Sequence, residues 1–174
     1  VIGNPFPKAT WGISNTFRWK GFDLYFLIQG VSGLDVFNGD GYYTESKKFN
    51  RNYVKDRWIS AEYPGDGRTP TVGSAGISWE FTDYMIEDGS FVALRDVVLG
   101  YTFDKKKLKK AGLNSLRLYA SGQNLLYFWG KSYRGINPEA RVTTGSYSSP
   151  LVNGYQRGGF PIQSTVNIGF ELNF

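Results

Sequence analysis

The sequence contains no cysteine and no histidine among its 174 residues. Without cysteine, the chain forms neither a disulfide scaffold nor a thiolate metal site. Without histidine, it lacks the usual general base and the commonest transition-metal ligand, so hydrolytic triads with a histidine base are excluded. No apolar run reaches the roughly 20 residues of a transmembrane helix. We therefore expect no catalytic residues, no cofactor and no metal site, and we predict that the chain is not an enzyme.

The residues that are abundant favour a β-protein. Aromatic residues make up 17% of the chain, and its 22 glycines are spread without a period, which suits turns and tightly packed strands. The net charge of +5 is concentrated in a lysine run at positions 105, 106, 107, 109 and 110. Such a run indicates a solvated turn rather than a nucleic-acid site. Contact with anionic phospholipid head groups is an alternative interpretation of it.

The last residues of the sequence alternate in character. One parity is apolar and the other is mostly polar, which is the period-two pattern of a strand with unlike faces. The apolar positions are Val166, Ile168, Phe170, Leu172 and Phe174. An alternating strand that ends on an aromatic residue resembles the C-terminal strand of bacterial outer-membrane β-barrels. That resemblance implies an insertion signal formed by Phe170, Leu172 and Phe174.

The same pattern predicts five strands, joined by connections that are alternately short and long. We expect the strands at about 9–19, 22–30, 91–103, 116–128 and 161–174, with long loops at about 31–88 and 129–160. Outer-membrane barrels have short periplasmic turns and long extracellular loops, and each strand needs only about 9 to 11 residues to cross. The sequence therefore predicts an all-β fold, the antiparallel strands of a transmembrane β-barrel, with a periplasmic C-terminus. Because five strands cannot close a barrel, we expect the chain to be part of a larger one.

Several phrases together carry a resemblance to a known family. They are NPFPKATWGISNTFRWKGFDLYFLIQGVSG from Asn4, KDRWISAEYPGDGRTP from Lys55, EDGSFVALRDVVLGYTF from Glu87 and LNSLRLYASGQNLLYFWGKSYRGINPEA from Leu113. In this order they resemble the end of SusC/RagA-type TonB-dependent transporters of Bacteroidetes. One departure is Asn137, which precedes Pro138-Glu139 where the family often has aspartate.

The resemblance implies that residues 1–174 are the C-terminal portion of a 22-stranded barrel with an N-terminal plug, in the cell outer membrane. It implies nutrient uptake, in which a SusD-like surface lipoprotein captures an oligosaccharide or a peptide. The TonB–ExbB–ExbD motor would act through a plug that lies upstream of Val1. Outer-membrane lipid is the remaining expected partner, and no nucleic acid is expected.

Four aromatic residues in or beside the long loops are candidate contacts for substrate or for the lid lipoprotein: Trp58, Trp79, Trp129 and Tyr133. The alternative is that they pack the loops internally or form the interfacial girdle of aromatic residues. On the predicted strands, we expect Arg117, Gln123 and Glu171 to face the lumen. There they would line the solute path, or bind one another and the plug.

Acidic residues of the first long loop suggest two weaker possibilities. Asp35, Asn38 and Asp40 are oxygen donors in a glycine-rich stretch, but their spacing misses the EF-hand pattern, and turn formation explains them as well. A glycosidase needs two carboxylates held across a sugar bond, and nothing in the sequence fixes such a pair. The carboxylates in question are Glu80, Asp83, Glu87 and Asp88.

Two other classes of protein compete with the transporter. A soluble β-sandwich, such as a carbohydrate-binding module, would pack its apolar strand faces against each other and bind sugar with its loops. A structural surface protein would share the barrel but lack the plug. Solubility without detergent would indicate the module, whereas the sequence upstream of Val1 distinguishes the surface protein.

Overall fold

The structure is a computed structural model, and it describes residues 2–39, 57–67, 69, 83–109, 112–140, 153–156 and 159–174. The chain forms two compact units. The sheet unit comprises Thr10–Val31, Phe91–Phe128 and Ile162–Phe174, and the loop unit comprises Val1–Ala9, Ser32–Ser90 and Trp129–Pro161. Among the described residues, no helix is long and apolar enough to cross a membrane.

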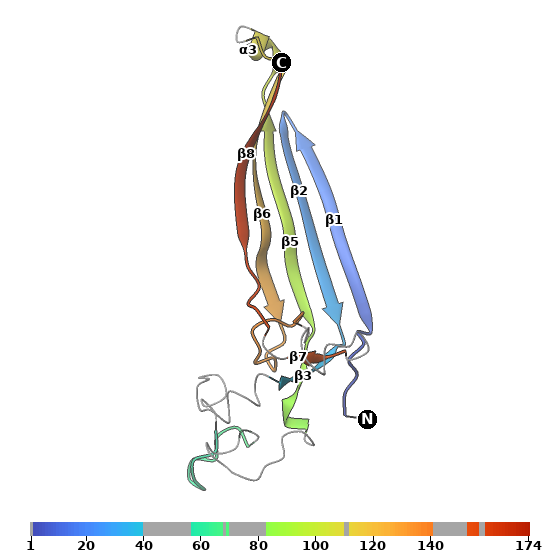
Figure 1. Cartoon of the computed structure of the whole chain (residues 1–174), viewed down its shortest axis with the longest axis vertical. Coiled ribbons are helices and arrows are strands. Elements are labelled where there is room, and N and C mark those ends of the chain that lie inside the picture. Colours follow the sequence, from blue (N-terminus) through green and yellow to red (C-terminus); the bar gives the residue numbers. More distant parts are fainter. Residues whose placement is uncertain are drawn as a thin grey trace. The chain divides into compact units, whose positions relative to one another are not determined.

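The sheet unit is built on one five-stranded sheet in the order β1-β2-β5-β6-β8. Neighbouring strands run in opposite directions, as the arrows in Figure 1 show and as the registers of β2 with β5 and of β6 with β8 require. The strands are β1 (Ala9–Trp19), β2 (Phe22–Ser32), β5 (Phe91–Thr102), β6 (Ser115–Trp129) and β8 (Thr165–Asn173). The all-β, antiparallel fold expected from the sequence is confirmed.

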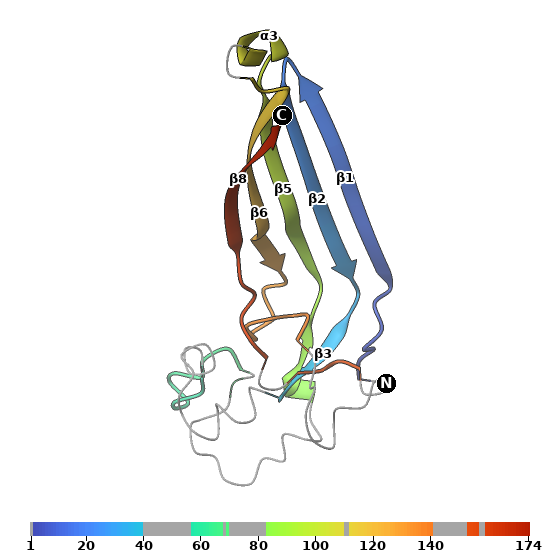
Figure 2. The ribbon, with the colours of Figure 1, turned by 45° about the horizontal axis from the view of Figure 1, so that its top comes forward.

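A two-residue turn joins β1 to β2. Lys20 and Gly21 both have positive φ angles, 46° and 90°, as a type I′ turn requires, and this turn matches the right-handed twist of the two strands. The Gly21 carbonyl accepts a hydrogen bond of 2.8 Å from the Thr102 amide. The turn is thereby attached to the end of β5, which lies beside β2 (Figure 2).

The connection between β5 and β6 contains a short helix, α3 (Lys105–Leu108), where the sequence suggested only a turn. Asp104 caps this helix because its side chain accepts a hydrogen bond of 2.9 Å from the Lys106 amide. A carboxylate at the N-cap position accepts a hydrogen bond from a first-turn amide that has no partner within the helix.

The pairing of β5 with β2 is interrupted by an irregularity. Leu27 of β2 pairs with Asp96, and Ile28 pairs with Leu94, so Arg95 is an extra residue in a β-bulge. A bulge changes the direction of the side chain at the extra position. Arg95 consequently joins Gln29 on the polar face of the sheet, with its Nε donating to Gln29 Oε1 at 2.7 Å.

A second irregularity fixes where β8 begins. Asn124 has a φ of 51° and follows Gln123, which is paired with Thr165 at the start of β8. Beyond this pair, the Ser164 hydroxyl donates to the Asn124 carbonyl at 2.7 Å. Side-chain hydrogen bonds thus replace the ladder, and β8 starts at Thr165 rather than at Pro161.

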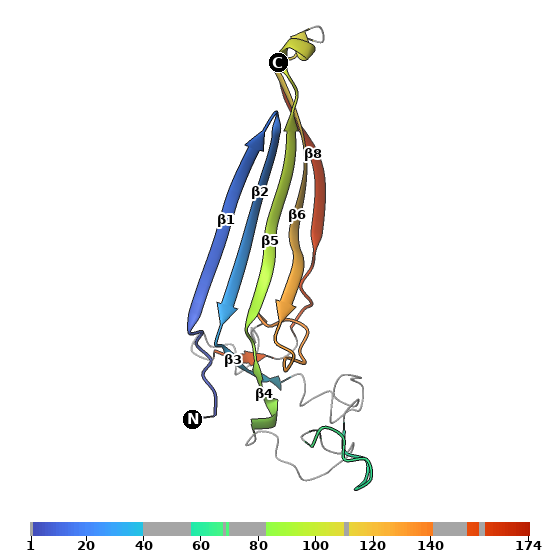
Figure 3. The same ribbon diagram turned by 180° about the vertical axis from the view of Figure 1, so that it is seen from behind.

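The loop unit contains a three-stranded sheet in the order β4-β3-β7. Its strands are β3 (Asp35–Asn38), β4 (Ile86–Asp88) and β7 (Tyr155–Gln156), and a 3-10 helix, η2 (Asp83–Met85), precedes β4. β4 runs antiparallel to β3, whereas β7 runs parallel to it. β3 and β4 are labelled in Figure 3. Residues from both predicted long loops therefore share one sheet. The sequence did not predict this sheet because its strands are short and show no clear alternation.

Candidate functional site

The apolar face of the five-stranded sheet is exposed. On β8, Ile168 is 86% exposed, and its cross-strand partner on β6 is Ala120. Other exposed members of this face are Trp11, Ile13, Phe17, Trp19, Phe22, Leu99, Leu118, Val166, Phe170 and Leu172. A single-layer sheet with one apolar face is suited to contact hydrocarbon, as the lipid-facing surface of a barrel does. A β-sandwich would need a second sheet covering this face.

The opposite face carries an ion-pair network over three strands. Arg117 of β6 donates from Nε and Nη2 to the two oxygens of Asp23 on β2, at 3.1 and 2.6 Å. Its Nη1 donates to Glu171 Oε1 on β8 at 2.9 Å. The side chain passes over β5 at Gly100, where an added Cβ would lie 2.6 Å from both Arg117 Nη2 and Asp23 Oδ1. Of the two roles expected for Arg117 and Glu171, mutual binding is present in the structure.

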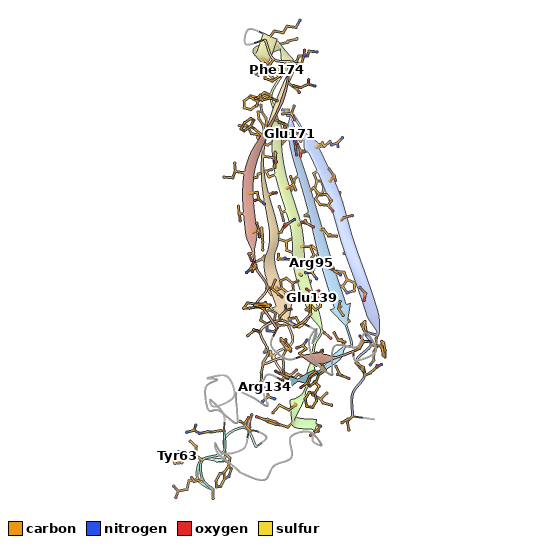
Figure 4. The ribbon with its side chains drawn as sticks, viewed as in Figure 1. Tyr63, Arg95, Arg134, Glu139, Glu171 and Phe174 are labelled. Carbon is orange, nitrogen blue, oxygen red and sulfur yellow. The ribbon has the colours of Figure 1, made fainter. Side chains whose placement is uncertain are left out.

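Arg95 organises a second polar network on this face. Besides Gln29, it donates to Asn124 Oδ1 at 3.2 Å and to the Tyr127 hydroxyl. Its guanidinium also lies 5.6 and 5.2 Å from the ring centroids of Phe91 and Tyr127. Glu171 lies near the end of the sheet that carries α3, whereas Arg95 lies farther along the strands (Figure 4). Polar groups with partners therefore lie at two separate levels of this face.

The loop unit is held by Glu87, whose carboxylate is almost fully buried. Glu87 Oε2 accepts from Asn38 Nδ2 at 3.1 Å and from the Arg134 amide at 2.7 Å. Its Oε1 accepts from Arg134 Nε at 2.8 Å. Burial disfavours the charge on Arg134, but the Glu87 carboxylate and Tyr84 together outweigh burial and raise the pKa of Arg134 above its usual value. Glu87 is thus committed to an ion pair that joins β4 to the second long loop.

Tyr133 packs inside the loop unit rather than on its surface. It is 5% exposed, and its hydroxyl donates to Gln156 Oε1 at 2.8 Å. Gln156 in turn donates to the Pro138 carbonyl at 2.7 Å. Tyr133 therefore fits the alternative of internal packing, and its ring also supports the exposed Trp129 through an edge contact with 6.1 Å between centroids.

The structure gives a reason for asparagine at position 137. Its Oδ1 accepts from the Glu139 amide at 2.9 Å, while its Nδ2 donates to the Phe160 carbonyl at 3.0 Å. An aspartate would retain the first hydrogen bond but has no donor for the second. Asn137 thereby attaches the segment before β8 to the loop that follows β6.

Two of the predicted aromatic contacts are exposed. Trp58 is 45% exposed and Trp129 is 42% exposed, whereas Trp79 lies outside the described residues. The segment that carries Trp58 closes on itself, because the Trp58 amide donates to the Thr69 carbonyl at 2.8 Å. Sequence reasoning missed the exposed rings of Tyr63 and Phe160, since tyrosine and phenylalanine in irregular segments give no periodic signal.

The weaker acidic candidates are engaged in structural hydrogen bonds. Asp35 Oδ2 accepts from the Asn4 amide at 2.8 Å, and Asp88 Oδ1 accepts from the Ser90 amide at 2.9 Å. Asp40 and Glu80 lie outside the described residues. In the part of the chain that the structure describes, no three acidic residues gather as a metal ion would require.

The fold and its two faces define the class of protein: the sheet is a segment of an antiparallel transmembrane β-barrel. No family model matches the chain. The whole chain aligns with the TonB-dependent receptor P3 of Formosa agariphila at 32% identity and with the TonB-dependent receptor SusC of Bacteroides thetaiotaomicron at 24% identity. These matches confirm the resemblance to SusC/RagA-type TonB-dependent receptors.

Solved structures show the same fold. The RagAB peptide importer in the closed-closed state matches with a TM-score of 0.73 over 100% of this chain, at 21% sequence identity. The open-open state matches with a TM-score of 0.69 over 97% of the chain, at 22% identity. This chain spans 17% of the length of the receptor P3 and 16% of SusC.

Proposed function

We propose that this chain forms five adjacent strands at the C-terminal end of the barrel wall of an outer-membrane TonB-dependent transporter. The observation that carries the proposal is the two-faced sheet, apolar and exposed on one side and lined with paired polar groups on the other. The whole transporter takes up oligosaccharides or peptides together with a SusD-like surface lipoprotein. The TonB–ExbB–ExbD motor drives uptake through a region upstream of Val1. The names of the relatives, TonB-dependent receptors and a peptide importer, support this function.

In this proposal, the short connections face the periplasm and the two long loops are extracellular. Trp58 and Trp129 are then available to contact the lid lipoprotein or the substrate, because flat aromatic rings stack on sugars and fill apolar pockets of a partner. Trp79 remains a candidate for the same role. Phe170, Leu172 and Phe174 form the insertion signal on the last strand.

The membrane placement predicts opposite outcomes for arginine on the two faces of the sheet. Ile168→Arg in the full-length receptor should cost about 2 to 4 kcal/mol of stability if this position lies near the middle of the membrane. Ser121→Arg, on the polar face, is the matched control and should cost far less. Folding into lipid vesicles, followed by urea titration, measures both. Equal stability of the Ile168→Arg variant and the wild type would overturn the assigned facing.

Transport is tested separately, in cells. A strain that lacks the full-length receptor should fail to grow when one oligosaccharide or one peptide mixture is the sole nutrient, and the wild-type receptor should restore growth. Comparing the two nutrients assigns the substrate class. Unchanged growth of the deletion strain on a broad panel of both nutrient classes would contradict an uptake function.

A further inference from the structure

The lysines of the connection between β5 and β6 are not used by the transport function. Leu108 of α3 is buried, with 8% of its surface exposed, and the start of α3 is fixed by the Asp104 cap. Lys105, Lys106 and Lys109 are exposed. Because Leu108 takes the buried position, these lysines hold their ammonium groups in solvent.

The carboxylates nearby are committed to other partners. Asp104 caps α3, while Asp23 and Glu171 bind Arg117. Within the described residues, none of the three exposed lysines forms an ion pair. The positive charge of this connection is therefore not neutralised by the part of the chain that the structure describes.

The cationic connection begins at the end of β5, close to the turn between β1 and β2. The hydrogen bond between the Thr102 amide and the Gly21 carbonyl brings the end of β5 beside the turn between β1 and β2. At that turn, the exposed ring of Trp19 has Lys20 Nζ 4.8 Å from its centroid. In a bilayer, apolar side chains contact the hydrocarbon, tryptophan lies at the interface, and lysine contacts the phosphates. The side chains here follow the same order.

We propose that Lys20, Lys105, Lys106 and Lys109 form a binding surface for the phosphate groups of anionic phospholipids. The occupant is a lipid head group rather than an acidic protein, because the connection follows a strand with an exposed apolar side, and the end of this strand is bonded to the turn beside Trp19 and Lys20. This inference rests on the membrane placement in the proposed function.

The test uses the full-length receptor in lipid nanodiscs that contain labelled phosphatidylglycerol or labelled phosphatidylcholine. The wild type should associate preferentially with phosphatidylglycerol, and the preference should decrease as salt is added. A triple variant, in which glutamine replaces each of Lys105, Lys106 and Lys109, should show a lower preference, by about fivefold for each lysine. The triple arginine variant keeps the charge and should keep the preference. Lys131→Gln, an exposed lysine of the loop unit, is the matched control and should leave the preference unchanged.

Three outcomes would overturn the proposal. The first is a triple glutamine variant that retains the preference for phosphatidylglycerol. The second is a control variant that lowers the preference as much as the triple variant does. The third is a triple variant that loses a co-purifying acidic protein but no lipid, which would assign the lysines to that protein. A receptor that does not enter the nanodisc contradicts the membrane placement as well, so the two failures are distinguishable.

Discussion

At the scale of single residues, Glu87 determines how the two long loops are held together. Its carboxylate accepts hydrogen bonds from Asn38 and from both the amide and the side chain of Arg134. Glutamine has the same shape but carries no charge, and its amide group would face these donors with a donor of its own. A buried ion pair that loses one partner leaves the other charge without compensation.

Glu87→Gln should therefore destabilise the loop unit by about 3 to 5 kcal/mol. Hydrogen exchange of the Arg134 amide in the full-length receptor measures the effect, and this amide should exchange much faster in the variant. Glu62→Gln is a suitable control because Glu62 is exposed in the same unit. Slow exchange of the Arg134 amide in the Glu87→Gln variant would contradict the role of Glu87 in stabilising the loop unit.

At the scale of elements, the turn between β1 and β2 depends on a glycine. A Cβ at Gly21 would lie 2.7 Å from the Thr102 carbonyl oxygen, and the φ of 90° disfavours any L-residue. Gly21→Ala should destabilise the sheet by about 1 to 3 kcal/mol, as measured by the urea midpoint of the refolded receptor. Gly12→Ala is the control, because a Cβ there meets its nearest atom at 3.8 Å, an ordinary contact. Equal midpoints for the two variants would show that the turn tolerates a side chain.

The strands themselves show what an alternating pattern predicts and where it stops. The pattern predicted five strands with the observed faces because alternation along a strand is a local property. It did not predict the bulge at Arg95, since the extra residue becomes apparent only when β2 is paired with β5. The pairing of β6 with β8 likewise ends at Gln123 because Asn124 has a positive φ angle. The pattern of residues did not predict this conformation.

At the scale of the whole molecule, the last aromatic residue is expected to govern insertion of the barrel. Deleting Phe174 should reduce the amount of folded full-length receptor in outer membranes several-fold, whereas Phe174→Tyr should retain it. Surface labelling of intact cells measures the difference. Undiminished display of the deletion variant would contradict the insertion signal formed by Phe170, Leu172 and Phe174.

The exposed tryptophans are expected to act in the assembled complex. Trp58→Ala and Trp129→Ala should each weaken binding of the SusD-like lipoprotein by about tenfold or more if these rings are central contacts. Lys131→Gln, close to Trp129 in the sequence, is the control and should bind normally. Isothermal titration with the purified full-length receptor gives the affinities. Unchanged affinity of both alanine variants would contradict a role of these rings in contacting the lipoprotein.

The amino-acid sequence alone was enough to predict the strand faces, the short turns and the absence of cysteine and histidine chemistry. These features depend on neighbouring residues or on composition, so they can be read without knowing the fold. The folded chain was needed to show that Glu87 pairs with Arg134, that Arg95 bulges toward Gln29 and that Tyr133 is buried. Each of these features depends on segments far apart in the chain, which meet only when strands pair. Neither a charge nor an aromatic ring shows in the sequence which partner it will meet.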